Sequence, residues 1–294
     1  MNPDDEEVVA DLHMHTTASD GTVDVVERLR QARDCSLETI AVTDHDVIAA
    51  EITSRRTTRE GIELVAGVEV RADFEGTKVE LLGYFVDPSD ETLSALLERA
   101  RGFRTERNRE LVDRLAAVTG LDLSYDELDA SVPGGLGRPH LASVLVEEGV
   151  VDSIGDAFDT YLGEDGSCFV PMDRHPSSDV VDAIQGAGGV VSLAHPGRVA
   201  TSAAHVETIV DRLTAEGLDA LEVAYPYGAE TSPRYADIGV ADARRLADDH
   251  GLLATGGSDC HGPGSGKFRI CEVGLTREQY GTIRARADER RALS

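Results

Sequence analysis

Short apolar segments that end in a histidine or an aspartate recur along this chain, and segments with helical periodicity separate them. Residues 8–12, 39–43 and 189–194 are such segments, and they are followed directly by His13, Asp44 and His195. Further strands are predicted at 62–70, 79–86, 220–224 and 252–255, and helices at 23–33, 180–187, 206–215 and 242–249. Strands that alternate with helices favour parallel pairing, so the pattern predicts an α/β fold with a parallel sheet, open or closed into a barrel.

The region between residues 88 and 170 has a different pattern. It contains a long charged helical stretch at 92–118, a Pro133-Gly134-Gly135 loop and two shorter helical stretches at 141–148 and 154–162. The alternation of strands and helices resumes after it. We therefore predict a main domain made of 1–87 and 171–294, and a helical insert at 88–170.

Side chains that can bind metal ions lie at the predicted C-terminal ends of strands. They are His13, His15, Asp20, His45, Glu69, His195, Asp259 and His261. In a β/α barrel these strand ends meet at one mouth, where active sites lie. Side chains two positions apart on an extended segment point the same way, so His13 can hold one ion together with His15. Imidazole and carboxylate ligands suit divalent Zn, Mn or Fe, and this number of ligands predicts two or three ions.

Taken singly, each of these motifs has an ordinary structural explanation. A lone His-x-His is a weak indication of a metal site, and Asp-His-Asp after a strand is common in turns. A metal site is favoured because five of the nine histidines fall at predicted strand ends. His175, His205 and His250 have no candidate ligand near them in the sequence, and we predict that they are solvated or structural.

His140 belongs to the predicted insert, within Gly137-Arg138-Pro139-His140. One interpretation is the start of a helix, with Pro139 at its first position. The other is a phosphate-binding pair, in which Arg138 contacts phosphate oxygens and His140 donates to the phosphate or its leaving group. Residue chemistry alone leaves both interpretations open.

The net charge of −27 restricts both the environment and the partners. The chain has 55 acidic and 28 basic residues, and of the basic ones only Lys78 and Lys267 are lysine. Acidic residues spread along a whole chain suit molar salt, where the Debye length is about 3 Å. We therefore predict a halophilic protein of a salt-accumulating cytoplasm. No basic stretch could follow a nucleic-acid backbone, so duplex DNA is not an expected ligand, whereas a small phosphorylated substrate beside metal ions is.

No N-terminal segment has the pattern of a signal peptide, and no apolar run approaches the roughly 18 residues of a membrane span, so no membrane partner is expected. The four cysteines, Cys35, Cys168, Cys260 and Cys271, fit no zinc-ribbon or finger spacing. We predict reduced thiols in a cytosolic protein. No pattern in the sequence indicates an oligomeric state.

Several stretches together resemble the PHP (polymerase and histidinol phosphatase) family. They are residues 11–15 with 19–21, then 42–46, 67–69, 193–196 and 257–262, in the family's order. The resemblance implies a distorted (β/α)7 barrel, a two- or three-metal site and phosphoester hydrolysis. Residues 137–140, within a helical insert, resemble the nucleotide phosphatase and 5′-3′ exoribonuclease-like branch of the family.

The family's pattern also implies how the ligands are shared. One metal ion would be held by His13, His15, Glu69 and Asp259, and a second by Asp20, His45 and His261. Glu69 and His195 would help to hold a third. The chain departs from the pattern at Glu80, where many relatives have a histidine. Glu80 could bind Mn or Fe and change the charge of the third site, or it could be a solvent-facing strand residue.

The resemblance therefore implies a metal-dependent phosphatase that hydrolyses phosphate monoesters of nucleotides, of the AMP or 3′,5′-bisphosphate type, by metal-activated water. Some members of this branch trim short RNA from its 5′ end. The insert would cap the active site. Alternatives are a histidinol-phosphate phosphatase on the same scaffold, and a non-catalytic metal-binding accessory module. A metal-dependent amidohydrolase also opens with His-x-His, but neither Lys78 nor Lys267 lies at a predicted strand end, where a metal-bridging lysine would be needed.

Overall fold

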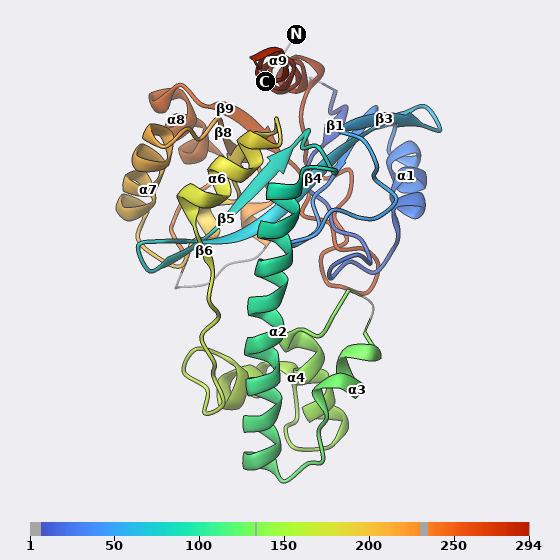
Figure 1. Cartoon of the computed structure of the whole chain (residues 1–294), viewed down its shortest axis with the longest axis vertical. Helices are drawn as coiled ribbons and strands as arrows, with labels where there is room; N and C mark the ends of the chain where they lie inside the picture. The colour runs from blue at the N-terminus through green and yellow to red at the C-terminus, as the bar shows by residue number, and fades with distance from the viewer. Residues whose placement is uncertain (1–6, 133, 230–234, 294) are drawn as a thin grey trace. The chain divides into compact units, whose positions relative to one another are not determined.

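A computed structural model describes residues 7–132, 134–229 and 235–293 (Figure 1). The described chain divides into two compact units. The first unit contains the residues up to Glu98 together with those from His175 onward, and the second contains Arg99–Arg174. The insert predicted at 88–170 overlaps the second unit, and its role as a cap stays a prediction.

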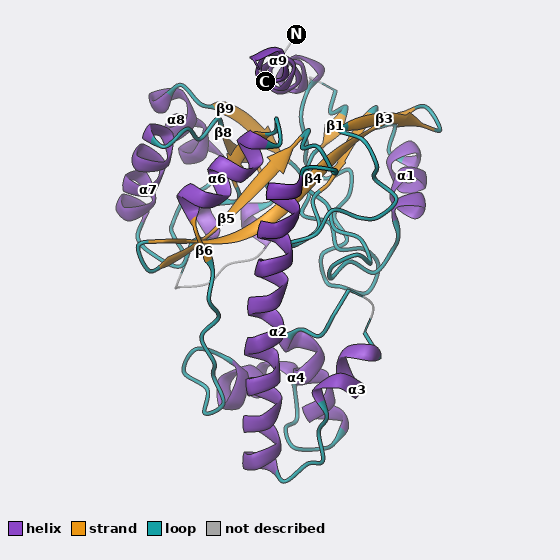
Figure 2. Cartoon of the chain, in the orientation of Figure 1, coloured by secondary structure: helices purple, strands orange, loops and turns teal. Residues whose placement is uncertain are grey.

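The first unit is built on one mixed β-sheet, whose strands are orange in Figure 2. Its strands are β1 (Ala10–Asp11), β2 (Thr39–Val42), β3 (Arg56–Arg59), β4 (Ile62–Phe74), β5 (Thr77–Tyr84), β6 (His175–Pro176), β7 (Val190–Leu193), β8 (Ala220–Ala224) and β9 (Leu253–Gly256). The strand order is β1-β2-β4-β5-β7-β8-β9, and β3 and β6 also pair with β4. The α/β class predicted from the sequence is confirmed.

The prediction of a parallel sheet was wrong for part of it. Strand β5 runs antiparallel to both β4 and β7, and β3 runs antiparallel to β4. The reason is a tight turn at Glu75-Gly76, where both residues have a positive φ, of 48° and 88°. Such a two-residue turn matches the twist of a hairpin, so it returns the chain alongside β4 without a crossover helix.

The two ends of the strand order, β1 and β9, approach each other. The amide of Leu12 donates to the carbonyl of Gly256 at 3.1 Å, and Met14 forms a parallel bridge with Cys260. Gly256 lies here because a side chain would collide with Ala224, whose Cβ is 2.4 Å from the position that a Cβ of residue 256 would take. The segments that follow β1 and β9 are therefore held side by side.

Helices cover the sheet of the first unit. They are α1 (Val25–Asp34), α6 (Ser177–Gly186), α7 (Ala203–Ala215), α8 (Val240–His250) and α9 (Arg277–Leu293). Helix α1 packs on β2 and β4, α6 on β4, β5 and β7, and α8 on β8 and β9. The Asp24 side chain accepts from the amide of Glu27 and so caps α1. Short 3-10 turns at Pro196–Arg198 and Tyr227–Ala229 follow β7 and β8.

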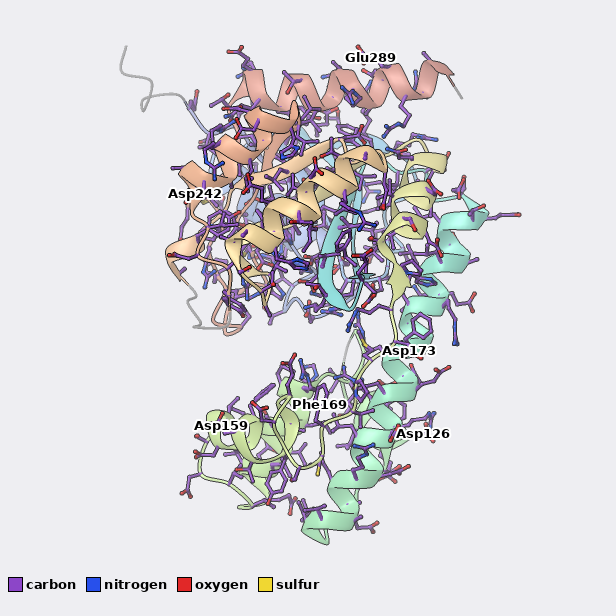
Figure 3. The ribbon with its side chains drawn as sticks, turned by 90° about the vertical axis from the view of Figure 1, so that its left-hand side faces the viewer. Asp126, Asp159, Phe169, Asp173, Asp242 and Glu289 are labelled. Carbon is purple, nitrogen blue, oxygen red and sulfur yellow. A yellow bond between two sulfur atoms is a disulfide. The ribbon has the colours of Figure 1, made fainter. Side chains whose placement is uncertain are left out.

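Aliphatic side chains form the core of this unit, as a chain with 4% aromatic residues requires. All four residues of β2 and of β7 are buried. Acidic side chains remain outside: Asp242 on α8 and Glu289 on α9, labelled in Figure 3, are exposed.

The second unit is helical. It contains most of α2 (Glu91–Thr119), with α3 (Tyr125–Ala130), α4 (Arg138–Glu147), α5 (Ile154–Ala157) and a π-turn at Phe158–Leu162. Its own core contains Leu111, Leu115, Leu141, Leu145 and Leu162. The unit thus buries a separate hydrophobic cluster.

The expectation that all four cysteines are reduced was wrong for two of them. Cys35 and Cys271 form a disulfide, with Cα atoms 5.7 Å apart, whereas Cys168 and Cys260 are free and buried. The two bonded residues are separated by 236 positions, so no local spacing could indicate the pair.

None of the helices in the described part of the chain combines the length and the apolar character that a membrane span requires.

A buried aspartate anchors α9 to the sheet. Asp219, which precedes β8, accepts from Arg290 at 2.7 and 2.9 Å, from Arg286 at 3.0 Å and from the amide of Val191 at 3.0 Å. Its side chain is only 2% exposed. The sequence analysis gave no prediction for α9, because the helix has few apolar residues and depends on these charged contacts.

We expect Asp219→Asn to lower the free energy of unfolding by about 2 kcal/mol, because it removes one charge from a largely buried ion pair. Denaturant unfolding at constant salt would measure this. Glu106→Gln is the matched control, since it breaks an exposed ion pair with Arg99 and should change stability by less than about 0.5 kcal/mol. Equal effects of the two substitutions would show that Asp219 does not anchor α9.

Candidate metal centre

Histidine and carboxylate side chains from distant parts of the sequence converge at one place in the first unit. Groups whose ligand atoms lie within 4.8 Å of one another include all the residues predicted to bind metal: His13, His15, Asp20, His45, Glu69, Glu80, His195, Asp259 and His261. Most follow the C-terminal ends of β1, β2, β7 and β9. The structure thus brings the predicted ligands together, and metal binding by them stays a prediction.

Glu69 lies at the middle of the cluster and is 1% exposed. Its Oε2 atom is 3.0 Å from His45 Nδ1, 3.4 Å from His15 Nε2 and 3.5 Å from His13 Nε2, and its Oε1 is 3.0 Å from His195 Nε2. The sequence predicted Glu69 at the end of a strand, and this was wrong. Glu69 lies inside β4, because β4 continues to Phe74 before the hairpin. A carboxylate with imidazoles on both oxygens has the arrangement of a bridging ligand.

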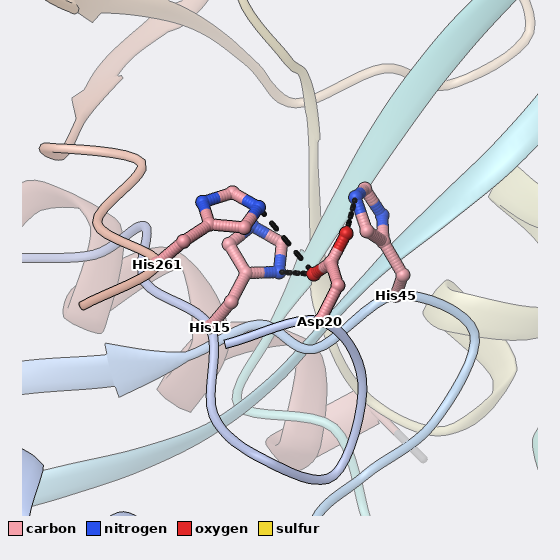
Figure 4. A group of neighbouring side chains, drawn as sticks. All are labelled: His15, Asp20, His45 and His261. Atoms are coloured by element: carbon pink, nitrogen blue, oxygen red, sulfur yellow. Dashed lines mark ion pairs between the residues drawn. The ribbon is translucent and has the colours of Figure 1, made fainter. Parts of the chain in front are cut away.

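Figure 4 shows one group of candidate ligands, which consists of His15, Asp20, His45 and His261. Asp20 Oδ1 is 3.4 Å from His261 Nε2 and 3.6 Å from His15 Nδ1, and its Oδ2 is 3.7 Å from His45 Nε2. The side chain of Asp20 is 39% exposed, whereas that of His15 is fully buried. The group therefore has one carboxylate on the solvent side and imidazoles behind it.

Three further groups share residues with this one: His13 with His15 and Asp259, His13 with Glu69 and His195, and His45 with Glu69 and Glu80. Asp259 Oδ1 lies 3.2 Å from His15 Nε2 and 3.6 Å from His13 Nε2. Because the groups overlap, neighbouring ions would share ligands.

The chemistry of these atoms fits divalent cations. His13 Nε2, both ring nitrogens of His15 and His45 Nδ1 are buried and have no hydrogen-bond partner among the described residues. A buried nitrogen without a partner is costly unless something else fills that role. Imidazole nitrogens mixed with carboxylate oxygens are typical ligands of Zn, Mn and Fe.

The protonation states of His45 and Asp259 suit cation binding. Burial lowers the pKa of His13, but the charges of Glu222 and Glu69 outweigh it and hold that pKa well above its usual value. Burial, reinforced by the charge of Arg71, holds the pKa of His45 well below its usual value. Burial raises the pKa of Asp259, but the ammonium of Lys267 and neighbouring imidazoles outweigh it and hold that pKa well below its usual range. A neutral imidazole and an ionised carboxylate are the forms that bind metal ions.

Glu222 orients two of the imidazoles, although the sequence analysis did not single it out. His13 Nδ1 donates to Glu222 Oε1 at 2.8 Å, and the amide of His195 donates to Oε2 at the same distance. This leaves His13 Nε2 facing Glu69 and Asp259. The signal was present, because Glu222 is a fully buried charge within the otherwise apolar strand Ala220–Ala224.

Asp44 and Arg28 hold the loop that carries His15 and Asp20. Asp44 accepts from the amide and the hydroxyl of Thr16, at 2.7 and 2.6 Å, and from the Ser19 hydroxyl at 2.6 Å. Arg28, a fully buried side chain, donates to the carbonyl of His15. Asp44 in the Asp-His-Asp motif thus acts as a turn residue.

A family model described as PHP domain matches residues 11–127. A 5′-3′ exoribonuclease of Haemophilus influenzae is 33% identical over 257 residues, which cover 86% of this chain and 90% of that protein. This chain belongs to the PHP domain family. The family resemblance seen in the motifs is therefore confirmed.

Other relatives have related names. A 3′,5′-nucleoside bisphosphate phosphatase of Chromobacterium violaceum is 32% identical over 264 residues, covering 87% of this PHP chain and 88% of that protein. The solved structure of a protein from Bifidobacterium adolescentis, described as a metal-dependent phosphoesterase, superposes with a TM-score of 0.77, 30% identity and coverage of 96% and 98% of the two chains. An amidohydrolase from Chromobacterium violaceum, with bound sulfate and no metal, has a TM-score of 0.75, 29% identity and coverage of 94% and 96%.

Both lysines of this PHP protein contact carboxylates of the cluster, although neither lies at a predicted strand end. Lys78 Nζ lies 3.0 Å from Glu80 Oε1, and Lys267 Nζ lies 3.0 Å from Asp259 Oδ2. Glu80 is also 3.1 Å from Arg71 Nε, and its Oε2 is 3.6 Å from His195 Nε2. With a side chain that is 13% exposed, Glu80 faces the cluster and is not a solvent-facing strand residue.

Arg138 and His140 lie in the second unit, at the first turn of α4. His140 Nδ1 accepts from the amide of Gly137 at 3.0 Å, and Arg138 Nη1 donates to the carbonyl of Leu162 at 3.3 Å. The interpretation as a helix start is confirmed, although Pro139 is the second residue of the helix and not the first, because α4 begins at Arg138. Their role in catalysis stays a prediction.

The other three histidines make structural contacts. His175 Nε2 lies 3.1 Å from the carbonyl of Leu96, His205 Nε2 lies 3.2 Å from the Thr77 hydroxyl, and His250 lies 4.0 Å from Asp211. None of the three belongs to a group of candidate ligands in the described parts of the chain. This agrees with their prediction as solvated or structural residues.

We expect Glu222→Gln to weaken binding of Mn²⁺ by about 10- to 100-fold, the usual effect of losing a carboxylate that orients a histidine ligand. Calorimetric titration of metal-free protein would measure it. Glu207→Gln, which changes an exposed carboxylate on α7, should leave the affinity unchanged. Unaltered affinity in Glu222→Gln, with the fold intact by circular dichroism, would contradict the orienting role.

Proposed function

We propose that the protein is a metal-dependent phosphoesterase that removes phosphate from nucleotides such as AMP and nucleoside 3′,5′-bisphosphates. The observation that carries this proposal is the buried cluster of histidine and carboxylate side chains in a PHP domain. Two relatives support the substrate class through their names, 3′,5′-nucleoside bisphosphate phosphatase and 5′-3′ exoribonuclease. The second name also supports trimming of short RNA from its 5′ end.

Two or three divalent ions, Mn, Fe or Zn, would supply Lewis acidity and lower the pKa of a water molecule. The chain's own contribution is to hold the ligands in place. Glu69 would bridge neighbouring ions, and Glu222 would keep His13 Nε2 directed at them. Asp20, His45 and His261 would bind one ion. His195 and Glu80 would complete the site of a third ion.

We also propose that the sheet closes into a barrel and that the helical second unit caps the active site. The hydrogen bond from Leu12 to Gly256 and the bridge between Met14 and Cys260 support closure into a distorted (β/α)7 barrel. The helical second unit would serve as the cap of the active site. The exposed acidic residues support a protein of a salt-rich cytoplasm, although the Cys35–Cys271 disulfide is more common in oxidising compartments.

Two alternative enzymes use the same kind of scaffold. A histidinol-phosphate phosphatase would need the same metal cluster and would differ in its leaving-group contacts. An amidohydrolase is the name of one structural neighbour, but the bound sulfate in that structure suits an oxyanion site. The accessory-module alternative is disfavoured, because each predicted ligand is present and lies in the cluster.

We expect phosphate release from AMP or adenosine 3′,5′-bisphosphate in molar KCl with Mn²⁺, and little from histidinol phosphate. The double substitution His13→Ala, His15→Ala should lower the rate more than about 100-fold, because it removes ligands and not only their supports. Release of inorganic phosphate measures this directly. A larger rate on histidinol phosphate would replace the nucleotide assignment, and no release from folded, metal-loaded protein would favour the accessory module.

If the second unit caps the active site, Arg138 and His140 should affect turnover. We expect Arg138→Ala to raise KM, because a guanidinium can form two hydrogen bonds with phosphate oxygens. We expect His140→Ala to lower kcat by about 10²-fold, the usual contribution of a general acid. Steady-state kinetics on adenosine 3′,5′-bisphosphate separate the two effects. Wild-type constants in both variants would remove this unit from the mechanism.

A further inference from the structure

The first unit contains a cavity that lies apart from the metal cluster. Its volume of about 450 Å³ is within the usual range for small-molecule pockets. Gly188, which lines it, precedes β7, whereas the candidate ligand His195 follows the other end of that strand. Phe85 also lines it, because antiparallel pairing places the end of β5 beside the start of β7. The cavity and the metal cluster therefore lie at opposite ends of β7.

Positive charge exceeds negative charge around this cavity, in contrast to the chain as a whole. Three of the ten residues that line it are arginines, Arg55, Arg56 and Arg291, and two are aspartates, Asp87 and Asp288. The whole chain has 55 acidic and 28 basic residues. The side chains of Arg55 and Arg56 are 27% and 32% exposed, so water screens their charges only in part. The local surplus of positive charge favours an anionic ligand.

The backbone brings two consecutive guanidinium groups to the same cavity. Consecutive residues of a strand point to opposite faces, but Arg55 lies in a bend before β3, which begins at Arg56, so both side chains can line one cavity. Gly188 has a φ of 72°, and a Cβ at this position would lie 2.1 Å from Nη1 of Arg55. A side chain at residue 188 would thus occupy the place of the Arg55 guanidinium.

The guanidinium of Arg55 has only long hydrogen bonds to its partners. It donates to the carbonyl of Phe85 at 3.3 Å and to Asp87 Oδ2 at 3.4 Å, whereas charge-assisted hydrogen bonds are typically about 2.7–2.9 Å long. Asp87 makes its short hydrogen bonds with Ser89, from the hydroxyl at 2.6 Å and from the amide at 2.9 Å. These bonds are the main reason why the pKa of Asp87 lies below its usual value. Arg55 is therefore weakly bound by the carboxylate beside it.

Arg56 has equally distant partners. Its Nη2 lies 3.5 Å from Asp288 Oδ1, and its Nη1 lies 3.9 Å from Glu63 Oε1. Nη1 is buried and has no hydrogen-bond partner among the described residues, a state that costs free energy. Glu63 accepts its short hydrogen bond from the Tyr280 hydroxyl, at 2.8 Å. An oxyanion in the cavity would give both guanidinium groups the short hydrogen bonds that these carboxylates do not provide.

We propose that this cavity binds a small organic phosphate, with the phosphate group held by Arg55 and Arg56 and the apolar part against Phe85 and Ala287. Phe85 and Ala287 are buried and belong to one hydrophobic cluster, so they offer an apolar wall. The planar guanidinium group matches the geometry of phosphate oxygens. The ligand is bound here and not hydrolysed, because the candidate metal ligands lie at the other end of β7. The proposal therefore does not depend on the proposed function.

The test is binding of bromophenylphosphonate, an organic phosphonate that a phosphatase cannot hydrolyse, to the full-length chain. In crystals of the Mn²⁺-loaded protein, anomalous scattering from bromine should locate the probe in the cavity. Calorimetry of the metal-free and Mn²⁺-loaded forms should show that Arg55→Gln weakens this binding by about 10- to 100-fold, as the loss of charged hydrogen bonds predicts. Arg59→Gln is the matched control, because Arg59 belongs to the same strand but donates to the carbonyl of Glu51 and does not line the cavity.

A second variant and a second measurement guard against a local folding defect. The probe should raise the melting temperature of wild type and of Arg59→Gln more than that of Arg56→Gln, because ligand binding stabilises only a protein that binds it. A probe found only at the metal cluster, or wild-type affinity in both Arg55→Gln and Arg56→Gln, would overturn the proposal. Intact probe binding in a protein that hydrolyses no nucleotide would contradict the proposed function alone and leave this site supported.

Discussion

The carboxylate of Glu69 lies where four imidazoles meet, and the arrangement of the first unit depends on it. Its two oxygens contact His13, His15, His45 and His195, which follow β1, β2 and β7. A buried, ionised carboxylate loses several kcal/mol of hydration unless positive charge compensates it. Imidazoles that follow β1, β2 and β7 surround Glu69, a residue of β4, and lie within 3.0 to 3.5 Å of its oxygens.

Carboxylates outside the ligand set provide the rigidity that this arrangement needs. Glu222 fixes the ring of His13 and the backbone of His195, while Asp44 fixes the loop between His15 and Asp20. Backbone conformations that few residues adopt also occur here: φ is 26° at His195 and 50° at Asp259. Such conformations cost free energy, and hydrogen bonds such as that from His195 N to Glu222 hold them in place.

Four basic side chains gather at the candidate site. Arg71, Lys78, Arg198 and Lys267 all contact carboxylates of the cluster. In a chain whose basic residues are almost all arginine, both lysines lie at this place. Asp259 and Glu80 each have one oxygen toward histidines and one toward cations.

The sequence by itself determined the α/β class, the order of the family motifs and the identity of the nine candidate ligands, because each motif is local and lies beside an apolar strand. Tertiary structure decided what depends on distant segments meeting: the antiparallel course of β5, the disulfide between Cys35 and Cys271, and the helix α9 held by Asp219. It also decided that Glu222, Arg198 and Lys267 belong to the site. Hydrophobic periodicity shows which face of a segment is buried, but hydrogen bonds and ion pairs between segments depend on where the folded chain brings them together.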